Sequence, residues 1–476
     1  MTAAGDQPTV TPMRSGRTSP RTWVEYTRVR EMRGPLLVVS GLEGVGWDEF
    51  VRVRLGDGEV RHGVVLDVAQ DIAVVEMLEG TAGMDPASVR AEFTGAPYEI
   101  PVGPQWLGRV CNGRGAPLDG GPPVTGAQMP VAGAPLNPVR REAPVEPVLT
   151  GVSVIDALTT LVRGQKLPIF SPPGLPHLRL ACQIAAHSGT GGESFCVVVA
   201  TMGVTHADAA FVRDALAERR AARQLVLLLN LADDPVVERI LTPRIALTIA
   251  EQLAFGESGG RHVLVVLADM TNYCEALREV SSARGEIPSR RAYPGYLYSD
   301  LASMYERCGR IRGELGSVTL VPVVTMPGGD ITHPVPDLTG YITEGQIVLS
   351  ATEHARGVYP PVDALASLSR LMRHGVGTGH TRADHLPVAA QIFAALARAR
   401  QVRELTELIG ADALTAADHA YLDFDEGFRR GLVAQGGAES RTLDDTLERA
   451  WRILLELPSA ALTMLPEDLL ASHGVG

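Results

Sequence analysis

The chain has 476 residues, of which 45% are hydrophobic and 21% are charged, as expected for a globular protein of two or three domains. Its 43 basic and 55 acidic residues give a net charge of −12 without a long basic block, which argues against a nucleic-acid partner. The longest apolar runs, residues 224–232 and 263–268, are far shorter than the ~20 residues that a membrane helix needs, so direct membrane insertion is not expected.

The first 21 residues predict a disordered tail. They contain Gly, Pro, Ser, Thr and Arg but no apolar core, so they do not have the pattern of a secretory signal. The five cysteines are Cys111, Cys182, Cys196, Cys274 and Cys308. They lack CxxC spacing and lie mostly in apolar segments, which favours reduced core thiols of a cytosolic protein over a metal site.

Residues 22–95 predict a small antiparallel β-barrel or sandwich. From Val51 to Leu55, apolar residues alternate with arginine, which places the apolar side chains on one face of a strand. Gly-rich turns separate this run from further strand-like segments at residues 35–40, 60–68 and 72–78.

Residues 96–360 predict an α/β domain that follows a connection rich in Gly and Pro. Continuous apolar runs alternate with helix patterns such as residues 205–222, where Thr205 and Asp208 can cap the helix start. Such runs indicate a parallel sheet that is covered by helices on both faces. The expected strands are residues 166–170, 194–201, 225–230, 263–268 and 318–325.

Residues 361–476 predict a helical domain. Leucines, alanine and tryptophan recur at helical spacing from Leu443 to Leu455, Thr442 and Asp445 can cap this last clear helix, and Pro458 ends it. The expected order is therefore barrel, α/β domain and helical domain.

The segment from Ser171 to Leu178 stands where a phosphate-binding loop lies in NTPases, between a strand and a helix. The catalytic pattern G-x-x-x-x-G-K-[ST] supplies backbone N–H groups, a lysine charge and a magnesium-binding hydroxyl. Here Ser171 and Pro176 occupy the glycine positions, His177 the lysine position and Leu178 the hydroxyl position, and Gly174 lies between them.

This loop predicts that the chain does not hydrolyse ATP by the usual route. Three prolines remove three N–H donors, histidine is mostly neutral near pH 7, and leucine cannot bind magnesium. An ordinary strand–helix loop without any nucleotide history is the alternative interpretation of this segment.

Asp269 ends an apolar strand, as the magnesium-orienting Walker B aspartate does, although strand-end aspartates commonly cap the next helix. After the preceding strand the chain reads Met202-Gly203-Val204-Thr205-His206, without a carboxylate at the turn to orient an attacking water. This absence also speaks against hydrolysis by the chain itself.

Several motifs resemble the B subunits of vacuolar/archaeal-type (V/A-type) rotary ATPases and ATP synthases. These motifs are residues 174–177, 202–205, 230–235, 268–278, 293–296 and 330–347, the last reading DITHPVPDLTGYITEGQI. The similarity runs from about Tyr26 to the final helices, and it implies a P-loop-NTPase-like (RecA-like) central domain between a barrel and a helical domain.

The resemblance implies a non-catalytic subunit in an alternating A3B3 head with three catalytic A subunits. ATP or ADP would bind with Mg²⁺ at the A/B boundaries, with the metal held by the A subunit. The complex would include a central rotor stalk, peripheral stalk subunits and a membrane sector that moves protons or sodium ions. This chain would then lie at the cytoplasmic face of the membrane as a peripheral component.

The family's active contribution from B is an arginine in the segment Ser367-Leu368-Ser369-Arg370, and Arg370 occupies that position. The resemblance implies that Arg370 reaches into the neighbouring A subunit's site as an arginine finger. A planar guanidinium suits a developing phosphoryl charge, because it is always charged and donates two parallel hydrogen bonds. Taken alone, an arginine on a helical segment is most often a solvated surface charge.

Other positions are weaker candidates. Ser369 and Tyr341 are possible nucleotide contacts, and a core position is the alternative for the tyrosine. The cations Arg278, Arg290 and Arg291 can order an interface or form surface ion pairs.

His333 and Asp337 lie four residues apart, which invites a metal interpretation. Because Pro334 and Pro336 lie between them, we expect no regular helix there and no metal site.

Two rival functions remain at this stage. An autonomous NTPase of the same fold would need the lysine-bearing loop and the water-orienting carboxylate that are missing here. A pure scaffold or nucleotide-binding module would leave Arg370 with a structural role only.

Overall fold

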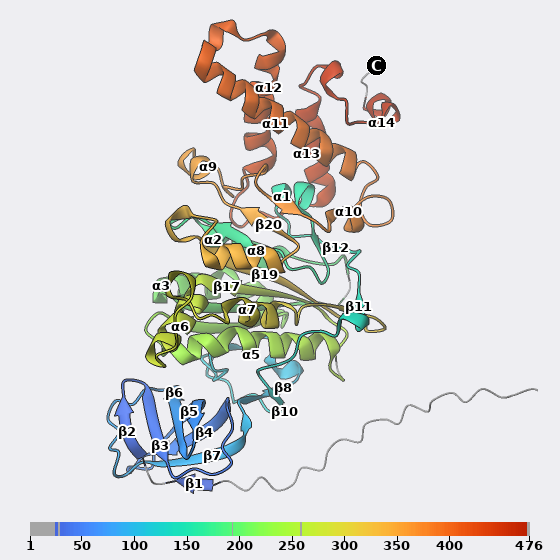
Figure 1. Cartoon of the computed structure of the whole chain (residues 1–476). Coiled ribbons are helices and arrows are strands. Elements are labelled where there is room, and N and C mark those ends of the chain that lie inside the picture. The colour runs from blue at the N-terminus through green and yellow to red at the C-terminus, as the bar shows by residue number, and fades with distance from the viewer. Residues whose placement is uncertain (1–23, 27–28, 193, 258, 474–476) are drawn as a thin grey trace, which may run out of the picture. The chain divides into compact units, whose positions relative to one another are not determined.

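The computed structural model describes residues 24–26, 29–192, 194–257 and 259–473, which fold as two compact units divided between Tyr98 and Glu99 (Figure 1). The predicted tail of residues 1–21 lies outside the described residues. In the part of the chain that is described, no helix is both long enough and apolar enough to cross a membrane.

The first unit is a seven-stranded antiparallel sheet with strand order β1-β7-β4-β5-β6-β3-β2. Its strands are β1 (Val24–Tyr26), β2 (Val29–Arg33), β3 (Leu36–Ser40), β4 (Glu49–Arg54), β5 (Val60–Ala69), β6 (Ile72–Met77) and β7 (Arg90–Pro97). In β4 the predicted alternation is confirmed, because Val51 and Val53 are buried in the core while Arg54 is exposed.

The second unit is built on a sheet with order β21-β20-β14-β19-β17-β15-β16-β9, in which every neighbouring pair except β21 and β20 is parallel. These strands are β9 (Val110–Asn112), β14 (Ile169–Ser171), β15 (Phe195–Val204), β16 (Leu225–Leu231), β17 (His262–Ala268), β19 (Ser317–Thr325), β20 (Gly345–Val348) and β21 (Leu368–Ser369). The central strands are buried along almost their whole length, as continuous apolar runs predict.

Short strands extend this framework. The strand β18 (Gly309–Ile311) joins β19 to β11 (Arg141–Glu142), and separate pairs form between β8 (Glu99–Val102) and β10 (Ala127–Pro130) and between β12 (Pro147–Val148) and β13 (Leu161–Val162).

Helices cover both faces of the sheet. Those that follow β14, β15, β16 and β17 are α2 (His177–His187), α3 (His206–Ala215) with α4 (Ala217–Ala221), α5 (Val236–Phe255) and α6 (Met270–Ala283). From β14 through β15 to β16, by way of α2 and α3, successive strands lie further toward one edge of the sheet. From β16 through β17 to β19, by way of α5 and α6, they lie back toward the other edge. Because parallel crossovers are right-handed, the two pairs lie on opposite faces (Figure 1).

The predicted helix at residues 205–222 is interrupted at Leu216, which separates α3 from α4. Its predicted start is confirmed, since the Thr205 hydroxyl accepts a hydrogen bond from the backbone N–H of Asp208 at 3.1 Å.

The segment with Pro334 and Pro336 is helical, so the prediction of no regular helix there was wrong. The helix α8 (Pro334–Ile342) begins at the first proline, and both prolines lie in its first turn, where N–H groups have no acceptor within the helix. His333 caps this helix. Within the described residues, no group of three or more His, Cys, Asp or Glu side chains is placed to hold a metal ion.

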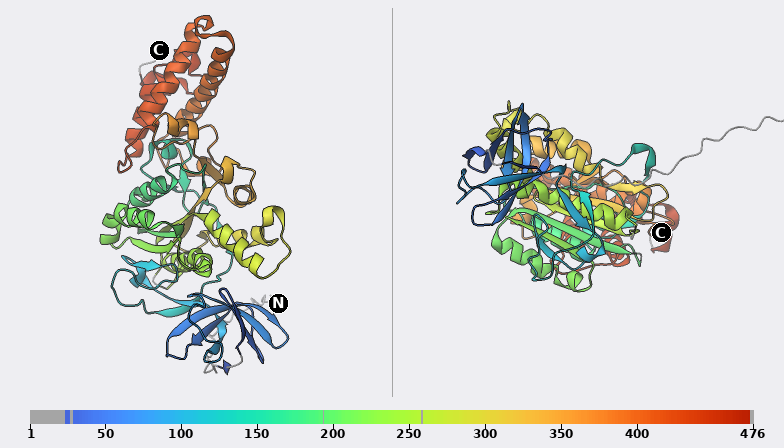
Figure 2. Two further views of the ribbon diagram at one scale, coloured as in Figure 1. Left: turned by 90° about the vertical axis from the view of Figure 1, so that its left-hand side faces the viewer. Right: turned by 90° about the horizontal axis from the view of Figure 1, so that it is seen from below.

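The helical region starts later than the sequence suggested. The sheet continues through β21, and apart from the short helices α9 (Ala351–Ala355) and α10 (Met372–Gly375) the first long helix is α11 (His385–Ile409). It lies beside α12 (Ala416–Gly427) and α13 (Leu443–Leu454), drawn in orange to red in Figure 2. The remaining α-helices of the described residues are α1 (Ser153–Leu158), α7 (Leu297–Tyr305) and α14 (Glu467–Ser472). In α13, Thr442 accepts from the N–H of Asp445, as predicted.

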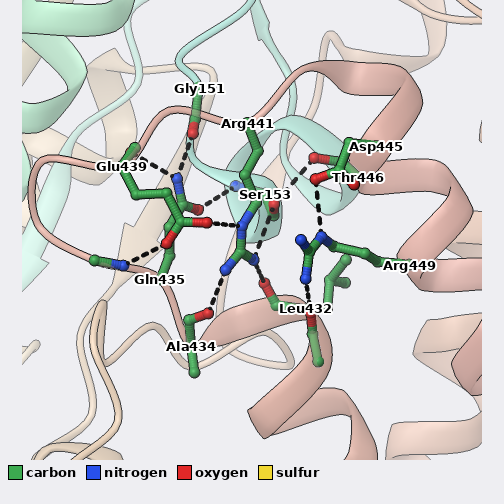
Figure 3. A network of polar contacts seen from close by, with 12 residues as sticks. Gly151, Ser153, Leu432, Ala434, Gln435, Glu439, Arg441, Asp445, Thr446 and Arg449 are labelled. Atoms are coloured by element: carbon green, nitrogen blue, oxygen red, sulfur yellow. Dashed lines mark hydrogen bonds and ion pairs between the residues drawn. The ribbon is translucent and has the colours of Figure 1, made fainter.

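Buried polar contacts join the helical region to the start of α1 (Figure 3). The Arg441 guanidinium donates to the carbonyls of Leu432 and Ala434, at 3.0 and 2.6 Å, and to the Glu439 carboxylate at 2.5 Å. The Gln435 side chain accepts from the N–H of Ser153 and donates to the Gly151 carbonyl. Arg441 also donates from its backbone N–H to the Gly151 carbonyl at 3.0 Å, so Arg441 and Gln435 together fix the helical region against residues 151–153.

The loop at Gly151 is held in turn by the buried carboxyl group of Asp156. It accepts hydrogen bonds from the N–H and hydroxyl of Thr150 and from the N–H of Gly151, at 2.7–2.9 Å. Burial outweighs these donors and raises the pKa of Asp156 to about 7.

All five cysteines are buried and free of disulfides, as their apolar surroundings predicted. Burial raises the pKa of the Cys111 thiol to about 11 and that of Cys182 to about 12, so these thiols stay protonated.

The Arg441 contacts generate a stability prediction. We expect Arg441→Ala to lower the free energy of unfolding by about 3 kcal/mol, because buried carbonyls lose their donor. Urea unfolding followed by tryptophan fluorescence would measure this change, since Trp451 is buried on α13 and contributes to the signal. The exposed Arg452→Ala serves as the control with a change below about 0.5 kcal/mol. Equal midpoints for the two variants would contradict this role of Arg441.

The Asp156 environment generates a pH prediction. The folded protein keeps this proton up to about pH 7, whereas the unfolded chain loses it near pH 4, so wild-type stability falls as pH rises through this window. Asp156→Asn cannot ionise, and its stability relative to wild type should rise by about 3 kcal/mol from about pH 5 to about pH 8. Chemical unfolding at several pH values measures this, with the exposed Asp444→Asn as control. A difference that does not vary with pH would show that Asp156 is ionised throughout.

Candidate functional site

The loop between β14 and α2 has the position of a phosphate-binding loop but a different interior. Ser171 is buried at the strand end, and its hydroxyl donates to the Pro172 carbonyl at 2.8 Å, so this hydroxyl is used within the loop. Gly174 has φ +80°, a left-handed conformation that favours glycine, although no heavy atom would crowd a side chain there.

The start of α2 offers few free N–H donors. Pro176 precedes the helix without a side-chain cap and has no N–H, and the N–H of His177 donates to the Leu175 carbonyl at 2.8 Å. Phosphate binding at a helix N-terminus depends on N–H groups that point freely at the anion. This loop therefore lacks the donor set that a phosphate group needs.

A pocket of about 540 Å³ lies beside this loop, at the carboxyl ends of the parallel strands, where α/β proteins bind ligands. Its wall brings together four of the predicted residues, Pro176, His177, Leu178 and Asp269. Ser171 and Gly174 belong to the loop but are not among the residues that line the pocket.

Asp269 acts as a helix cap, the alternative considered for it. One carboxylate oxygen accepts from the N–H of Thr271 at 2.8 Å, and both oxygens lie 3.2 Å from the N–H of Thr325. With Leu178 in place of a hydroxyl and Asp269 already engaged, the residues present do not form a Mg²⁺ site.

A second carboxylate lines the pocket besides Asp269, although the turn after β15 contributes none. Asp208, in the first turn of α3, accepts a hydrogen bond from the Thr205 hydroxyl at 2.8 Å. At the start of α2, the Nδ1 atom of His177 is buried and has no hydrogen-bond partner within the described ranges. Neither group replaces the lysine charge that phosphate binding uses.

An aromatic contact that the sequence did not predict joins α2 to Tyr359. The Arg179 guanidinium lies 4.6 Å from the centre of the Tyr359 ring, and the Tyr359 hydroxyl donates to Gln183 at 2.9 Å. Burial raises the pKa of Tyr359 to about 12. The Arg179 side chain, which lines the pocket, is therefore engaged on the chain's own aromatic ring.

Arg370 lies on a different part of the unit and is not among the residues of this pocket. The sequence suggested a helical segment for Arg370, but the residue directly follows β21 at the edge of the sheet. Its N–H donates to the Glu344 carbonyl at 3.0 Å. Its side chain is exposed and has no hydrogen bond or ion pair with any residue that the structure describes. The guanidinium is thus available to a neighbouring molecule.

The two weaker candidates for a nucleotide contact differ in exposure. Ser369 is buried, with its hydroxyl donating to the Thr160 carbonyl at 3.0 Å and accepting from Gln165 at 2.9 Å, so a nucleotide contact is not open to it within this chain. Tyr341, on α8, is 74% exposed, which excludes the core position considered for it.

The three further cations form ion pairs on the surface, as the alternative interpretation held. Arg278 pairs with Glu275, Arg290 lies 3.4 Å from Asp337, and Arg291 lies 3.0 Å from Asp330. Exposed pairs of this kind contribute little to stability.

Comparison with known families covers most of the chain. Residues 29–95 match the beta-barrel domain of the ATP synthase alpha/beta family, residues 151–369 match its nucleotide-binding domain, and residues 374–473 match the C-terminal domain of V and A type ATP synthase.

A curated relative from Aeropyrum pernix, named as the B subunit of an A-type ATP synthase, is 49% identical over 452 residues, covering 94% of this chain and 97% of the relative. The chain belongs to the B-subunit family of A/V-type ATP synthases. A solved structure of the ATP synthase subunit NeqB from Nanoarcheaum equitans matches this B-family chain with a TM-score of 0.70 and 37% identity, over 89% of this chain and all of that one.

The loop geometry predicts that the isolated B-family chain does not hydrolyse MgATP. With no lysine in the loop, few free loop donors and no metal site among the described residues, this pocket lacks the groups that stabilise the transition state of phosphoryl transfer. A coupled-enzyme assay of the purified chain should give only a trace rate, and His177→Ala should give the same rate if that trace is a contaminant. Turnover that grows with chain concentration and falls in His177→Ala would contradict the prediction.

Proposed function

We propose that this chain is the non-catalytic B subunit of an alternating A3B3 head, and that it donates Arg370 to the ATP site of the neighbouring A subunit. The observation that carries the proposal is an exposed guanidinium without a partner among the described residues, on backbone that is hydrogen-bonded into the sheet. The 49% identity to the B subunit of an A-type ATP synthase supports the choice of complex.

Arg370 supplies charge at the moment when the terminal phosphoryl group transfers. Negative charge spreads over the phosphoryl oxygens in that transition state, and a guanidinium placed within hydrogen-bond distance stabilises it. The same contact serves synthesis and hydrolysis, because both directions pass through one transition state. ATP or ADP binds at the A/B boundary, and the A subunit holds Mg²⁺, for which the described residues of this chain lack a site.

In this proposal the central stalk, the peripheral stalk and a membrane sector couple ATP turnover to the movement of protons or sodium ions. The B subunit lies peripherally on the cytoplasmic face and contacts no nucleic acid. The exposed ring of Tyr341 is a candidate contact for the nucleotide base in the same interface.

A pure scaffold role is the second candidate, favoured by the occupied donors of the loop and by the Arg179–Tyr359 contact inside this chain. It differs from the first in one respect only, because a scaffold does not need the Arg370 guanidinium.

The Arg370 assignment predicts a large loss of turnover in the assembled complex. We expect Arg370→Ala to lower kcat for ATP hydrolysis by about 10³-fold or more, equivalent to about 4 kcal/mol of barrier. Arg370→Lys should recover only a small part, because an ammonium cannot donate two parallel hydrogen bonds. Steady-state ATPase assays on complexes of verified subunit composition measure both changes.

Arg373→Ala is the matched control, since Arg373 is likewise exposed and lies three residues further along the chain. If Arg370→Ala and Arg373→Ala complexes both keep wild-type turnover, the scaffold role replaces the arginine finger.

A further inference from the structure

Arg370 follows a strand that is too short to fix it alone. The strand β21 has two residues and pairs only with β20, through Gly345 with Ser369 and Gln346 with Leu368, within the described part of the chain. The backbone of Arg370 adds one further hydrogen bond, to the Glu344 carbonyl at 3.0 Å. The place from which the guanidinium extends is therefore set by the position of Glu344.

Three separate contacts join Glu344 to Lys166. Its N–H donates to the Lys166 carbonyl at 3.0 Å, one carboxylate oxygen accepts from the Lys166 N–H at 2.8 Å, and the other lies 2.7 Å from the Lys166 ammonium. The Lys166 side chain is only 2% exposed, so its charge depends on protein partners.

A buried amide completes the support. The Gln165 side chain donates both to the Glu344 carbonyl at 3.0 Å and to the Ser369 hydroxyl at 2.9 Å. The carbonyl of Glu344 thus receives the N–H of Arg370 and the amide of Gln165 together. Glycine at position 345 permits the close approach of the two strands, because a side chain there would clash with the Leu368 carbonyl.

We propose that Glu344, held by the buried Lys166 and Gln165, is a positioning residue that sets the reach of Arg370 toward the neighbouring subunit. This inference rests on the proposed function of Arg370 and adds the part of this chain that orients it. Glu344 does not touch the nucleotide, and it acts only through the backbone that it shares with Arg370.

The chain offers a matched pair of carboxylates for the test. Glu306 is the second partner of the same buried ammonium, at 3.2 Å, but among its described contacts none reaches Arg370 or Ser369. Glu344→Gln and Glu306→Gln therefore each remove one ion-pair partner of the buried Lys166 ammonium. Only Glu344→Gln also loosens the backbone that carries Arg370.

In complexes assembled with the cognate A subunit, Glu344→Gln should lower kcat for ATP hydrolysis about tenfold and change KM by less than about twofold. Glu306→Gln should keep kcat within about twofold of wild type. Glu344→Asp, which retains the charge, should recover part of the loss. Equal kcat values for Glu344→Gln and Glu306→Gln would overturn the inference.

The double variant separates this inference from the function on which it rests. If Glu344 acts through Arg370, Glu344→Gln has no further effect in an Arg370→Ala complex, whereas a full additional tenfold loss shows an independent role and overturns the inference. If Arg370→Ala alone leaves turnover unchanged, the arginine finger itself fails. Should Glu344→Gln not assemble, the uncharged change Gln165→Met takes its place in the same cycle, with the same outcomes.

Discussion

The pairing of β14 on both of its sides is the constraint on which the second unit depends. This buried strand of three residues is hydrogen-bonded to β19 on one side and to β20 on the other. Its carboxyl end leads into the degenerate loop, and the residues just before it, Gln165 and Lys166, hold Glu344. One short strand therefore supports both the pocket and the backbone of Arg370, and a shift in its register would move both.

The fold does not require the chemistry that its loop has lost. The core of the second unit is formed by apolar side chains of the strands and their helices, and the pocket residues His177 and Asp269 are not part of it. Prolines are tolerated in the loop because no ladder hydrogen bond is needed there. A chain of this fold can thus carry stiff residues in place of phosphate-binding ones and keep the same scaffold.

Much of this arrangement was readable in the sequence, for a physical reason. Strands buried on both faces are continuous apolar runs, so β15, β16, β17 and β19 were predicted near their observed bounds, and the loop's missing donors follow from residue types alone. The two residues of β21 are too few to show a period, which is why Arg370 was assigned to a helical segment. The support of Arg370 was hidden because Lys166 meets its carboxylate partners 140 and 178 residues further along the chain. Pro334 and Pro336 led to the wrong prediction of no helix, because proline breaks a helix in its interior but is tolerated in its first turn.

The burial of every native thiol has a practical consequence for spectroscopy. Because the five cysteines are enclosed, one cysteine introduced at an exposed site such as Leu408, to which the proposed function gives no role, would react selectively with a maleimide dye or spin label. A second label on the partner subunit would then report interface distances in the working complex, without first removing cysteines that fill the core.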